Sequence, residues 1–241
     1  MNEYQAPRIV DDALIEDDST ISRFIAHVFS WMVAGLVMTA SAAYYVAQSG
    51  LVAKLYNLET GGMSGLGWVV MLAPLGFIVA MNMGFQRWSS MSLTLLFLAF
   101  SAIMGVSLSS IFLVYSASSI SQVFVITAVT FGVMAVIGYT TKTDLTKFGS
   151  LLMMALIGII IASFVNWFIG SAGLDYIISI GGVLIFTWLI AYDTQRLKRI
   201  ASGVEYGSET GTKLAILGAT SLYLNFINLF LFLLRLLGRR N

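Results

Sequence analysis

Residues 219–238, the last hydrophobic run of the chain, read ATSLYLNFINLFLFLLRLLG, and residues 188–199, at the end of the run before it, read WLIAYDTQRLKR. A helix of about 20 apolar residues can cross the roughly 30 Å hydrocarbon core of a bilayer. Asp193 in one run, and Asn225 and Asn228 in the other, are costly there, and such residues mark functional sites. We therefore expect the function to lie where these two runs meet and the upstream sequence to hold them.

The composition of the whole chain is that of a membrane protein. Hydrophobic residues make up 58% of the 241 residues and charged residues 10%, whereas about 25% of residues are charged in a typical soluble domain. The sequence predicts an all-α polytopic membrane protein with seven spans. These cover residues 24–47, 66–84, 91–115, 120–140, 148–169, 174–192 and 214–237.

Small residues inside the runs indicate how the helices pack. Alanine, glycine and serine recur, for example over residues 40–43 and 101–110, and small residues let helices approach closely. We therefore expect a single membrane domain over residues 21–241. Pro74 falls inside the second run and is expected to kink it, which is tolerated where a neighbouring helix satisfies the carbonyl group that proline frees.

The segment before the first run is acidic. Residues 1–20 contain six acidic residues and one basic residue, Arg8. Because such a segment buries little apolar surface, we predict a mobile, solvated tail, with docking onto a partner as the alternative. No basic and then apolar signal peptide precedes the first run, so that run is expected to act as its own insertion signal.

Lysine and arginine residues predict the orientation in the membrane. With seven spans, they are more numerous in the connections on the side of the amino terminus than on the other side. The positive-inside rule then places the amino terminus in the cytoplasm and the carboxyl terminus outside. The basic carboxyl-terminal segment is the exception, and it leaves open an arrangement in which one run is re-entrant and both ends are inside.

Several functions are excluded or disfavoured by composition. A net charge of +1 provides no strong positive field for nucleic acid, and a chain with no cysteine and one histidine, His27, lacks the ligands of a cysteine or histidine metal centre. Residues 62–65 read GMSG, which matches the serine motif of rhomboid-like intramembrane proteases. The motif lies in a polar loop, and the one histidine precedes it, so we expect no enzyme activity and no cofactor.

The last two runs strongly resemble the Bax inhibitor-1 family. The segments that carry the resemblance are AYDTQRLKR, residues 191–199, and SLYLNFINLFLFLLRLLG, residues 221–238. Bacterial members of that family include calcium-leak proteins and the modulator of the FtsH membrane protease. The resemblance implies an inner-membrane bundle in which six helices surround the seventh, and a pH-sensitive pair of aspartates that closes a pore on the cytoplasmic side.

Three residues can be assigned from this resemblance. Asp193 matches the aspartate of the sixth helix, whereas Asn225 stands where well-studied leak members carry the second aspartate. Arg87, in the sequence GFQRW, stands where such members have an arginine able to pair with the sixth-helix aspartate. Since an asparagine removes the repulsion between two carboxylates, we expect any proton switch to be blunted or shifted toward acid.

The residues themselves also allow purely structural roles. Asp193 can mark the membrane interface beside the basic residues that follow it, and Asn225 and Asn228 can serve as polar contacts between helices. If Asp193 and Asn225 instead face a pathway, their oxygens suit calcium but fall short of its usual six to eight ligands. A weak, hydrated calcium contact is therefore expected, with calcium as the transported ion.

Two functional hypotheses follow. The first is a pH-sensitive, passive cation leak channel for calcium, with Asp193 as the gate acid, Asn225 facing it, Arg87 as its counter-ion and Asn228 on the same pathway. The second is a regulator that transports nothing and binds another membrane protein, such as the FtsH protease. In both cases the lipid bilayer is the immediate surrounding of the chain.

Overall fold

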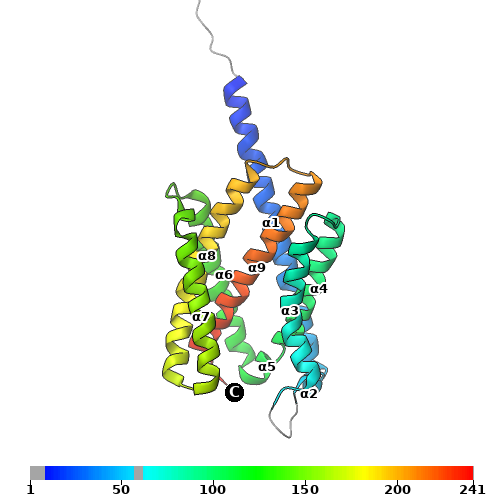
Figure 1. Cartoon of the computed structure of the whole chain (residues 1–241), viewed down its shortest axis with the longest axis vertical. Helices are drawn as coiled ribbons and strands as arrows, with labels where there is room; N and C mark the ends of the chain where they lie inside the picture. The colour runs from blue at the N-terminus through cyan, green and yellow to red at the C-terminus, as the bar shows by residue number, and fades with distance from the viewer. Residues whose placement is uncertain (1–8, 57–61, 241) are drawn as a thin grey trace, which may run out of the picture.

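The computed structural model describes residues 9–56 and 62–240, which are mainly helical. Seven of their helices are long and apolar enough to cross a membrane, which confirms the predicted class and number of spans (Figure 1). The elements are α1 (Ile9–Gln48), α2 (Val52–Leu55), α3 (Gly65–Gly84), α4 (Ser90–Leu108), α5 (Ile111–Val114), α6 (Ala117–Thr140), the 3-10 helix η1 (Leu145–Phe148), α7 (Gly149–Ile169), α8 (Ala172–Ala201) and α9 (Glu209–Leu237).

A serine side chain caps the amino-terminal end of five of the spans. In each case the serine hydroxyl oxygen accepts a hydrogen bond from the backbone N–H three residues later, which satisfies one of the donors that a first helical turn leaves free. The serines are Ser64 before α3, Ser89 before α4, Ser116 before α6, Ser171 before α8 and Ser208 before α9. Local sequence therefore defines where these helices begin.

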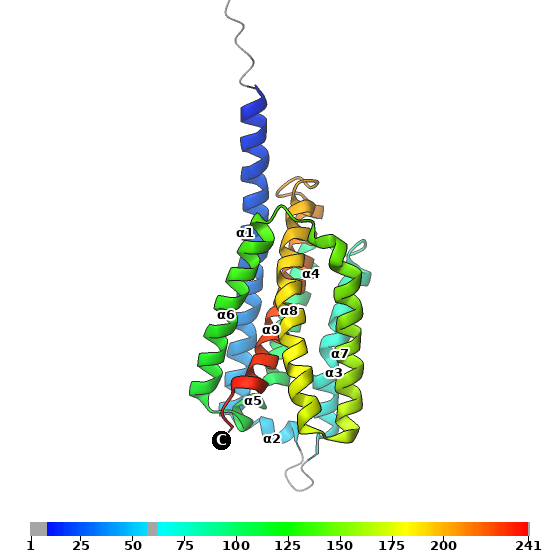
Figure 2. The same cartoon turned by 90° about the vertical axis from the view of Figure 1, so that its left-hand side faces the viewer.

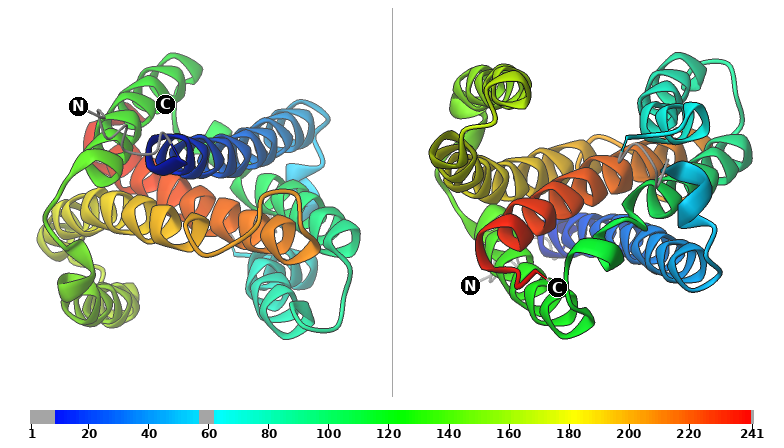
Figure 3. Two further views of the ribbon diagram at one scale, coloured as in Figure 1. Left: turned by 90° about the horizontal axis from the view of Figure 1, so that it is seen from above. Right: turned by 90° about the horizontal axis from the view of Figure 1, so that it is seen from below.

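Helix α9 lies at the centre of the bundle, as predicted. In its most apolar stretch 67% of the residues are buried, against 6% in the span that contains α7. It packs against α1, α4, α6 and α8 (Figure 3). Tyr223 of α9 is fully buried, and its ring centroid lies 6.0 Å from that of Phe97 and 5.5 Å from that of Phe100, both in α4. Aromatic packing thus anchors the middle of the central helix.

Two glycines allow the helices around α9 to approach one another closely. A methyl group at Gly105 of α4 would collide with the backbone carbonyl of Thr39 in α1. A methyl group at Gly138 of α6 would likewise collide with the backbone carbonyl of Ala191 in α8. Because van der Waals packing is a main source of helix association in lipid, these close approaches help to hold the bundle together.

Pro74 lies inside α3, and a neighbouring helix compensates for it. Proline has no N–H to donate to the carbonyl group four residues earlier, which here is that of Val70. That carbonyl instead accepts a hydrogen bond from the hydroxyl group of Ser107 in α4, at 2.8 Å. The contact joins α3 to α4 and satisfies the backbone group that the proline frees, as a spanning helix requires.

The described chain begins and ends at opposite ends of the bundle (Figures 1 and 2). This arrangement agrees with seven crossings and not with the alternative that puts both termini on one side. Near the carboxyl terminus, the N–H of Arg239 donates to the hydroxyl oxygen of Ser119 at 2.9 Å, which attaches the basic terminal segment to α6. Which end faces the cytoplasm stays a prediction.

Helix α1 starts before the predicted first span. It begins at Ile9 and extends beyond the other helices (Figure 2), so residues 9–20 of the predicted tail are helical. Residues 1–8 lie outside the described part of the chain, and the predicted mobility of the tail stays untested. We call the end of the bundle on this side the N-terminal end. The loops after α3, α6 and α8 lie there.

Helices α3 and α7 lie at the outside of the bundle (Figure 3). Helix α3 packs mainly on α4, and α7 packs mainly on α8. The two outer helices approach each other through Trp68 and Trp167, whose ring centroids are 6.2 Å apart. Trp68 lies at the start of α3, so this contact is at the end of the bundle opposite the N-terminal end.

Candidate functional site

Asp193 lies well inside α8 and not at its end. The apolar pattern predicts that the sixth span stops at residue 192, but α8 continues to Ala201, eight residues or about 12 Å beyond Asp193. The predicted end is wrong because the charged residues that follow extend the helix. The Asp193 side chain is 7% exposed, so it is an acid buried within the bundle.

Two side chains of α9 donate hydrogen bonds to the same oxygen of Asp193. The hydroxyl group of Ser221 donates to Oδ2 at 2.6 Å, and the Nδ2 amide group of Asn225 donates to Oδ2 at 2.8 Å. Residues four apart lie on one face of a helix, which is why both can reach one atom. The structure thus brings Asp193 and Asn225 into direct contact, within a group of three side chains that joins α8 to α9.

Ser221 is a site residue that the sequence did not predict. A serine is common in membrane helices, where its hydroxyl group can bond to a backbone carbonyl of its own helix, so its presence alone indicates little. The available signal is its position one helical turn before Asn225, in a run of otherwise apolar residues. Recognising that one carboxylate oxygen accepts from both residues requires the register of α8 against α9, which only the structure provides.

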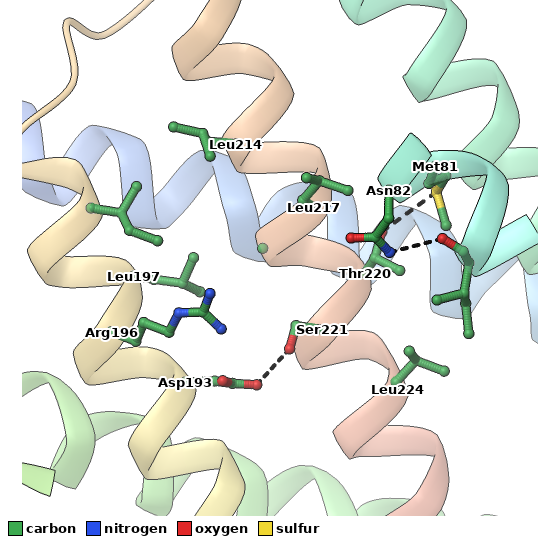
Figure 4. A pocket seen from close by; sticks show the side chains of 13 residues that line it. Met81, Asn82, Asp193, Arg196, Leu197, Leu214, Leu217, Thr220, Ser221 and Leu224 are labelled. Atoms are coloured by element: carbon green, nitrogen blue, oxygen red, sulfur yellow. Dashed lines mark hydrogen bonds between the residues drawn. The ribbon is translucent and has the colours of Figure 1, made fainter. Parts of the chain in front are cut away.

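A cavity of about 300 Å³ lies beside this group, between α3, α8 and α9 (Figure 4). Its polar lining comes from three helices and includes Asn82, Asp193, Arg196, Thr220 and Ser221. Within the described residues, Oδ1 of Asp193 accepts no hydrogen bond, and no side-chain nitrogen or oxygen is both buried and unpaired. Oδ1 is therefore accessible, while Oδ2 is held by α9.

Arg87 does not reach Asp193. It is exposed in the turn after α3, and it forms no ion pair with any residue that the structure describes. The predicted counter-ion and the acid are thus not brought together. Arg196, three residues after Asp193 on α8, lines the cavity instead, and its guanidinium group extends into it (Figure 4).

Asn228 also lies apart from Asp193. Its Nδ2 group donates to the backbone carbonyl of Leu224 at 2.8 Å, so the side chain is bonded back onto its own helix. Three residues after Asn225, it points to a neighbouring face of α9 and does not line the cavity. The two asparagines of this run therefore differ in role, and the one that contacts Asp193 is Asn225.

The last turns of α8, at the N-terminal end of the bundle, also hold the loop between α6 and α7. The Nε2 group of Gln195 donates to the carbonyl of Thr143 at 2.8 Å, and its Oε1 accepts from the N–H of Leu145 at 2.8 Å. Gln195 is 6% exposed, so this is a buried amide whose nitrogen and oxygen are both hydrogen bonded. Four residues later, Arg199 forms an ion pair with Asp144 at 2.6 Å.

Asp144 is outside the membrane-spanning segments, and its surroundings favour the charged form. The hydroxyl group of Thr146, the guanidinium group of Arg199 and the N–H of Thr146 all donate to Asp144 Oδ1. Together they lower the pKa of Asp144 to about 2. The loop is therefore anchored by a carboxylate that stays ionised over the physiological pH range.

The polar groups around Asp193 provide few ligands for a metal ion. Within the described residues, no group of three or more histidine, cysteine, aspartate or glutamate side chains could hold one. The oxygens of Asp193, Asn225 and Ser221 are fewer than the six to eight that calcium prefers.

Ser64 and His27 have local partners. Ser64, in the GMSG sequence, caps α3, and its hydroxyl group donates to the backbone carbonyl of Lys54 at 2.7 Å. His27 accepts a hydrogen bond at Nε2 from the indole N–H of Trp31, one turn later on α1, at 2.8 Å. Each side chain is thus used in local structure, and the structure does not bring the two into contact.

A second buried polar group lies on the opposite face of α9. The hydroxyl groups of Tyr223 and Thr39 are 2.6 Å apart, and that of Thr39 also donates to the backbone carbonyl of Ser101 at 2.8 Å. Tyr223 and Ser101 are fully buried, and Thr39 is 4% exposed. This group joins α9 to α1 and α4 near the middle of the spans.

The fold and the site define a class of protein. It is a seven-helix membrane bundle in which a buried acid of the sixth span is hydrogen bonded to the central seventh helix, beside a cavity. The family described as inhibitor of apoptosis-promoting Bax1 matches residues 21–241. The chain therefore belongs to the Bax inhibitor-1 family, as the resemblance of its last two runs predicts.

Similar proteins occur in distant bacteria. The chain is 42% identical over 230 residues to the inner membrane protein YbhL of Escherichia coli K12, covering 95% of this chain and 97% of that protein. It is 44% identical over 219 residues to an uncharacterised protein of Borreliella burgdorferi, with 91% and 93% covered. A protein of Rickettsia prowazekii, also uncharacterised, is 40% identical over 223 residues, with 92% of each chain covered.

Proposed function

We propose that this protein is a passive, gated cation leak of the inner membrane, that calcium is the ion it passes, and that Asp193 is the gate acid. One observation carries the proposal. A buried carboxylate has one oxygen held by the central helix and the other accessible beside a cavity between three helices. Acids inside membrane bundles are typical of ion pathways. The name of the similar Escherichia coli protein supports the location.

The three hydrogen-bonded side chains form the gate in this proposal. While Asp193 is ionised, Ser221 and Asn225 make charge-assisted hydrogen bonds to it, which are roughly twice as strong as neutral ones. These bonds hold α9 against α8 where the cavity ends. Protonation of Asp193 removes the charge and weakens both bonds, so the contact between the two helices loosens and the leak depends on pH.

The orientation follows from the basic residues. Arg196, Lys198 and Arg199 lie in the last two turns of α8, at the N-terminal end of the bundle, and basic residues favour the cytoplasmic side. In this arrangement the amino terminus and the cavity face the cytoplasm, and the carboxyl terminus is outside. An ion that moves toward the cytoplasm therefore passes the gate before it reaches the cavity.

The experiment that tests the proposal is calcium flux into dye-loaded proteoliposomes between pH 8 and pH 5. Native protein should exceed empty liposomes, and Asp193→Asn should change both the rate and its pH dependence. Asn225→Ala should also change the flux, because it removes one of the two donors. Asn228→Ala is the matched control, since it removes an amide of the same helix that does not touch Asp193. Equal flux from all samples and empty liposomes would refute the leak.

A second function has one observation in its favour. Helix α1 extends beyond the other helices at the N-terminal end (Figure 2). A regulator that binds a membrane protease would use such an extension and would need no pathway. Deletion of residues 2–18 distinguishes the two functions, because it should abolish regulation and leave the flux through the bundle intact.

A further inference from the structure

The cavity beside Asp193 is lined by one negative and one positive side chain. Asp193 and Arg196 are the charged residues among those that line it, and the others are neutral or apolar. The two are three residues apart on α8, so they lie on nearby faces of one helix. Figure 4 shows both side chains extending from α8 toward α9.

Arg196 makes no direct polar contact in the part of the chain that the structure describes. It forms neither an ion pair within 4.0 Å nor a hydrogen bond there. The other two basic residues of α8 are engaged. Lys198 donates to the carbonyl of Tyr139 at 3.1 Å, and Arg199 pairs with Asp144 at 2.6 Å. Arg196 is thus the basic residue of α8 whose charge can act on the contents of the cavity.

The order of Asp193 and Arg196 along α8 determines which charges an ion passes on its way to the N-terminal end. Helix α8 ends at Ala201, at the N-terminal end of the bundle, so Arg196 lies closer to that end than Asp193 does. Arg196 is also exposed, whereas Asp193 is 7% exposed. An ion between the gate and the N-terminal end therefore passes the guanidinium group as well as the carboxylate.

We propose that Arg196 determines the ion selectivity of the leak by disfavouring divalent cations relative to monovalent ones; this inference rests on the proposed function. Coulomb energy scales with the product of the charges, so a guanidinium group opposes a calcium ion twice as strongly as a potassium ion. It offsets the attraction of Asp193, which is likewise doubled for the divalent ion. The cavity then holds no net charge that would trap calcium.

This arrangement differs from that of a calcium-binding site. Such sites gather several carboxylates around the ion, and the number of charged ligands sets the affinity. One carboxylate offset by one guanidinium group gives low occupancy, so an ion that enters can also leave. Arg196 in this view keeps the calcium flux slow and lets monovalent cations compete for the same path.

The test measures calcium and potassium flux in parallel, with proteoliposomes loaded with a dye for each ion. The variants are Arg196→Gln, which removes the charge, and Arg196→Lys, which keeps it. Arg87→Gln is the matched control, since it removes an exposed arginine at the same end of the bundle that does not line the cavity. Gel filtration of each purified variant establishes that it folds.

We expect Arg196→Gln to raise the ratio of calcium to potassium flux by roughly three- to tenfold. Arg196→Lys and Arg87→Gln should stay within about twofold of the native ratio. A native leak whose ratio is unchanged in Arg196→Gln would overturn this inference and leave the proposed function standing. An equal rise in Arg87→Gln would also overturn it, because the effect would then come from surface charge. Flux of native protein no higher than that of empty liposomes would overturn both.

Discussion

Replacement of Asn225 by aspartate tests the gate most directly. The amide Nδ2 group donates to Oδ2 of Asp193 at 2.8 Å. In Asn225→Asp a carboxylate takes the place of this donor, so an attractive contact becomes a contact between two groups that cannot easily ionise together. We expect the new pair to keep one proton at a pH where the native site has lost it.

The size of the effect follows from the separation of the two groups. Two unit charges about 4 Å apart repel each other by about 4 kcal/mol at an effective dielectric constant of about 20. One pH unit corresponds to about 1.4 kcal/mol, so the upper limit of the shift is about three units. Water in the cavity screens part of the repulsion, and we therefore expect the midpoint of calcium flux against pH to move toward neutral by roughly one to three units.

A swapped pair provides the control. The double variant Asp193→Asn with Asn225→Asp again has one carboxylate and one amide, with their helices exchanged. If repulsion between carboxylates causes the shift, the midpoint of the double variant should return to within about half a unit of the native value. A single variant with an unchanged midpoint, or a double variant that keeps the full shift, would refute the assignment of the gate to this contact.

Three further predictions concern the scaffold. Gly138→Ala should destabilise the protein by about 1–3 kcal/mol, because its methyl group meets a backbone carbonyl of α8. Thermal unfolding in detergent measures this change in stability. Gly132→Ala is the control, because the space around Gly132 is open. Ser107→Ala should cost about 1 kcal/mol by removing the donor to the carbonyl that the proline of α3 frees; if unfolding is unchanged, that bond contributes nothing. Ionised Asp144 has a lowered pKa, so its contribution to the loop after α6 should be complete above its ordinary pKa of 3.8 and lost as pH falls through about 2. Protection of that loop against hydrogen exchange, relative to the intrinsic rate at each pH, should fall over this window in native protein and be low already at pH 7 in Asp144→Asn.

The spans were predictable because their signals are local. Apolar length alone defines a crossing of the bilayer, and all seven predicted runs are helical in the structure, the third as α4 followed by α5. The ends were less predictable for the same reason. The sixth run ends, by composition, at Tyr192, yet α8 continues to Ala201, and Gln195 and Arg199 in this extension are bonded to the loop after α6. Those partners are about 50 residues away in sequence, where no local pattern can indicate them.

The site was predictable in part. The cost of a charge or an amide in a membrane singles out Asp193 and Asn225, and the structure places them in contact. The basic residue near Asp193 was not predictable in this way, because basic residues near helix ends are common. Only the register of the helices shows which of them lies beside the acid. Arg87 is exposed in a loop, whereas Arg196 lines the cavity. Both arginines are visible in the sequence, but only the packing of the helices shows that Arg196 is the one beside Asp193.

The central helix is held on two faces, which restricts how a gate at Asp193 can open. Ser221 and Asn225 are four residues apart and face α8, whereas Tyr223, between them, faces α1 and α4 through Thr39. At about 100° per residue, Tyr223 lies on the opposite side of α9 from the other two. Rotation of α9 would therefore break the bonds on both faces at once, and the buried hydroxyl groups of Tyr223 and Thr39 would have no water to replace their bonds. A change at Asp193 alone breaks bonds on one face only, so the proposed gate opens by separation of α8 from α9 while α9 keeps its contacts with α1 and α4.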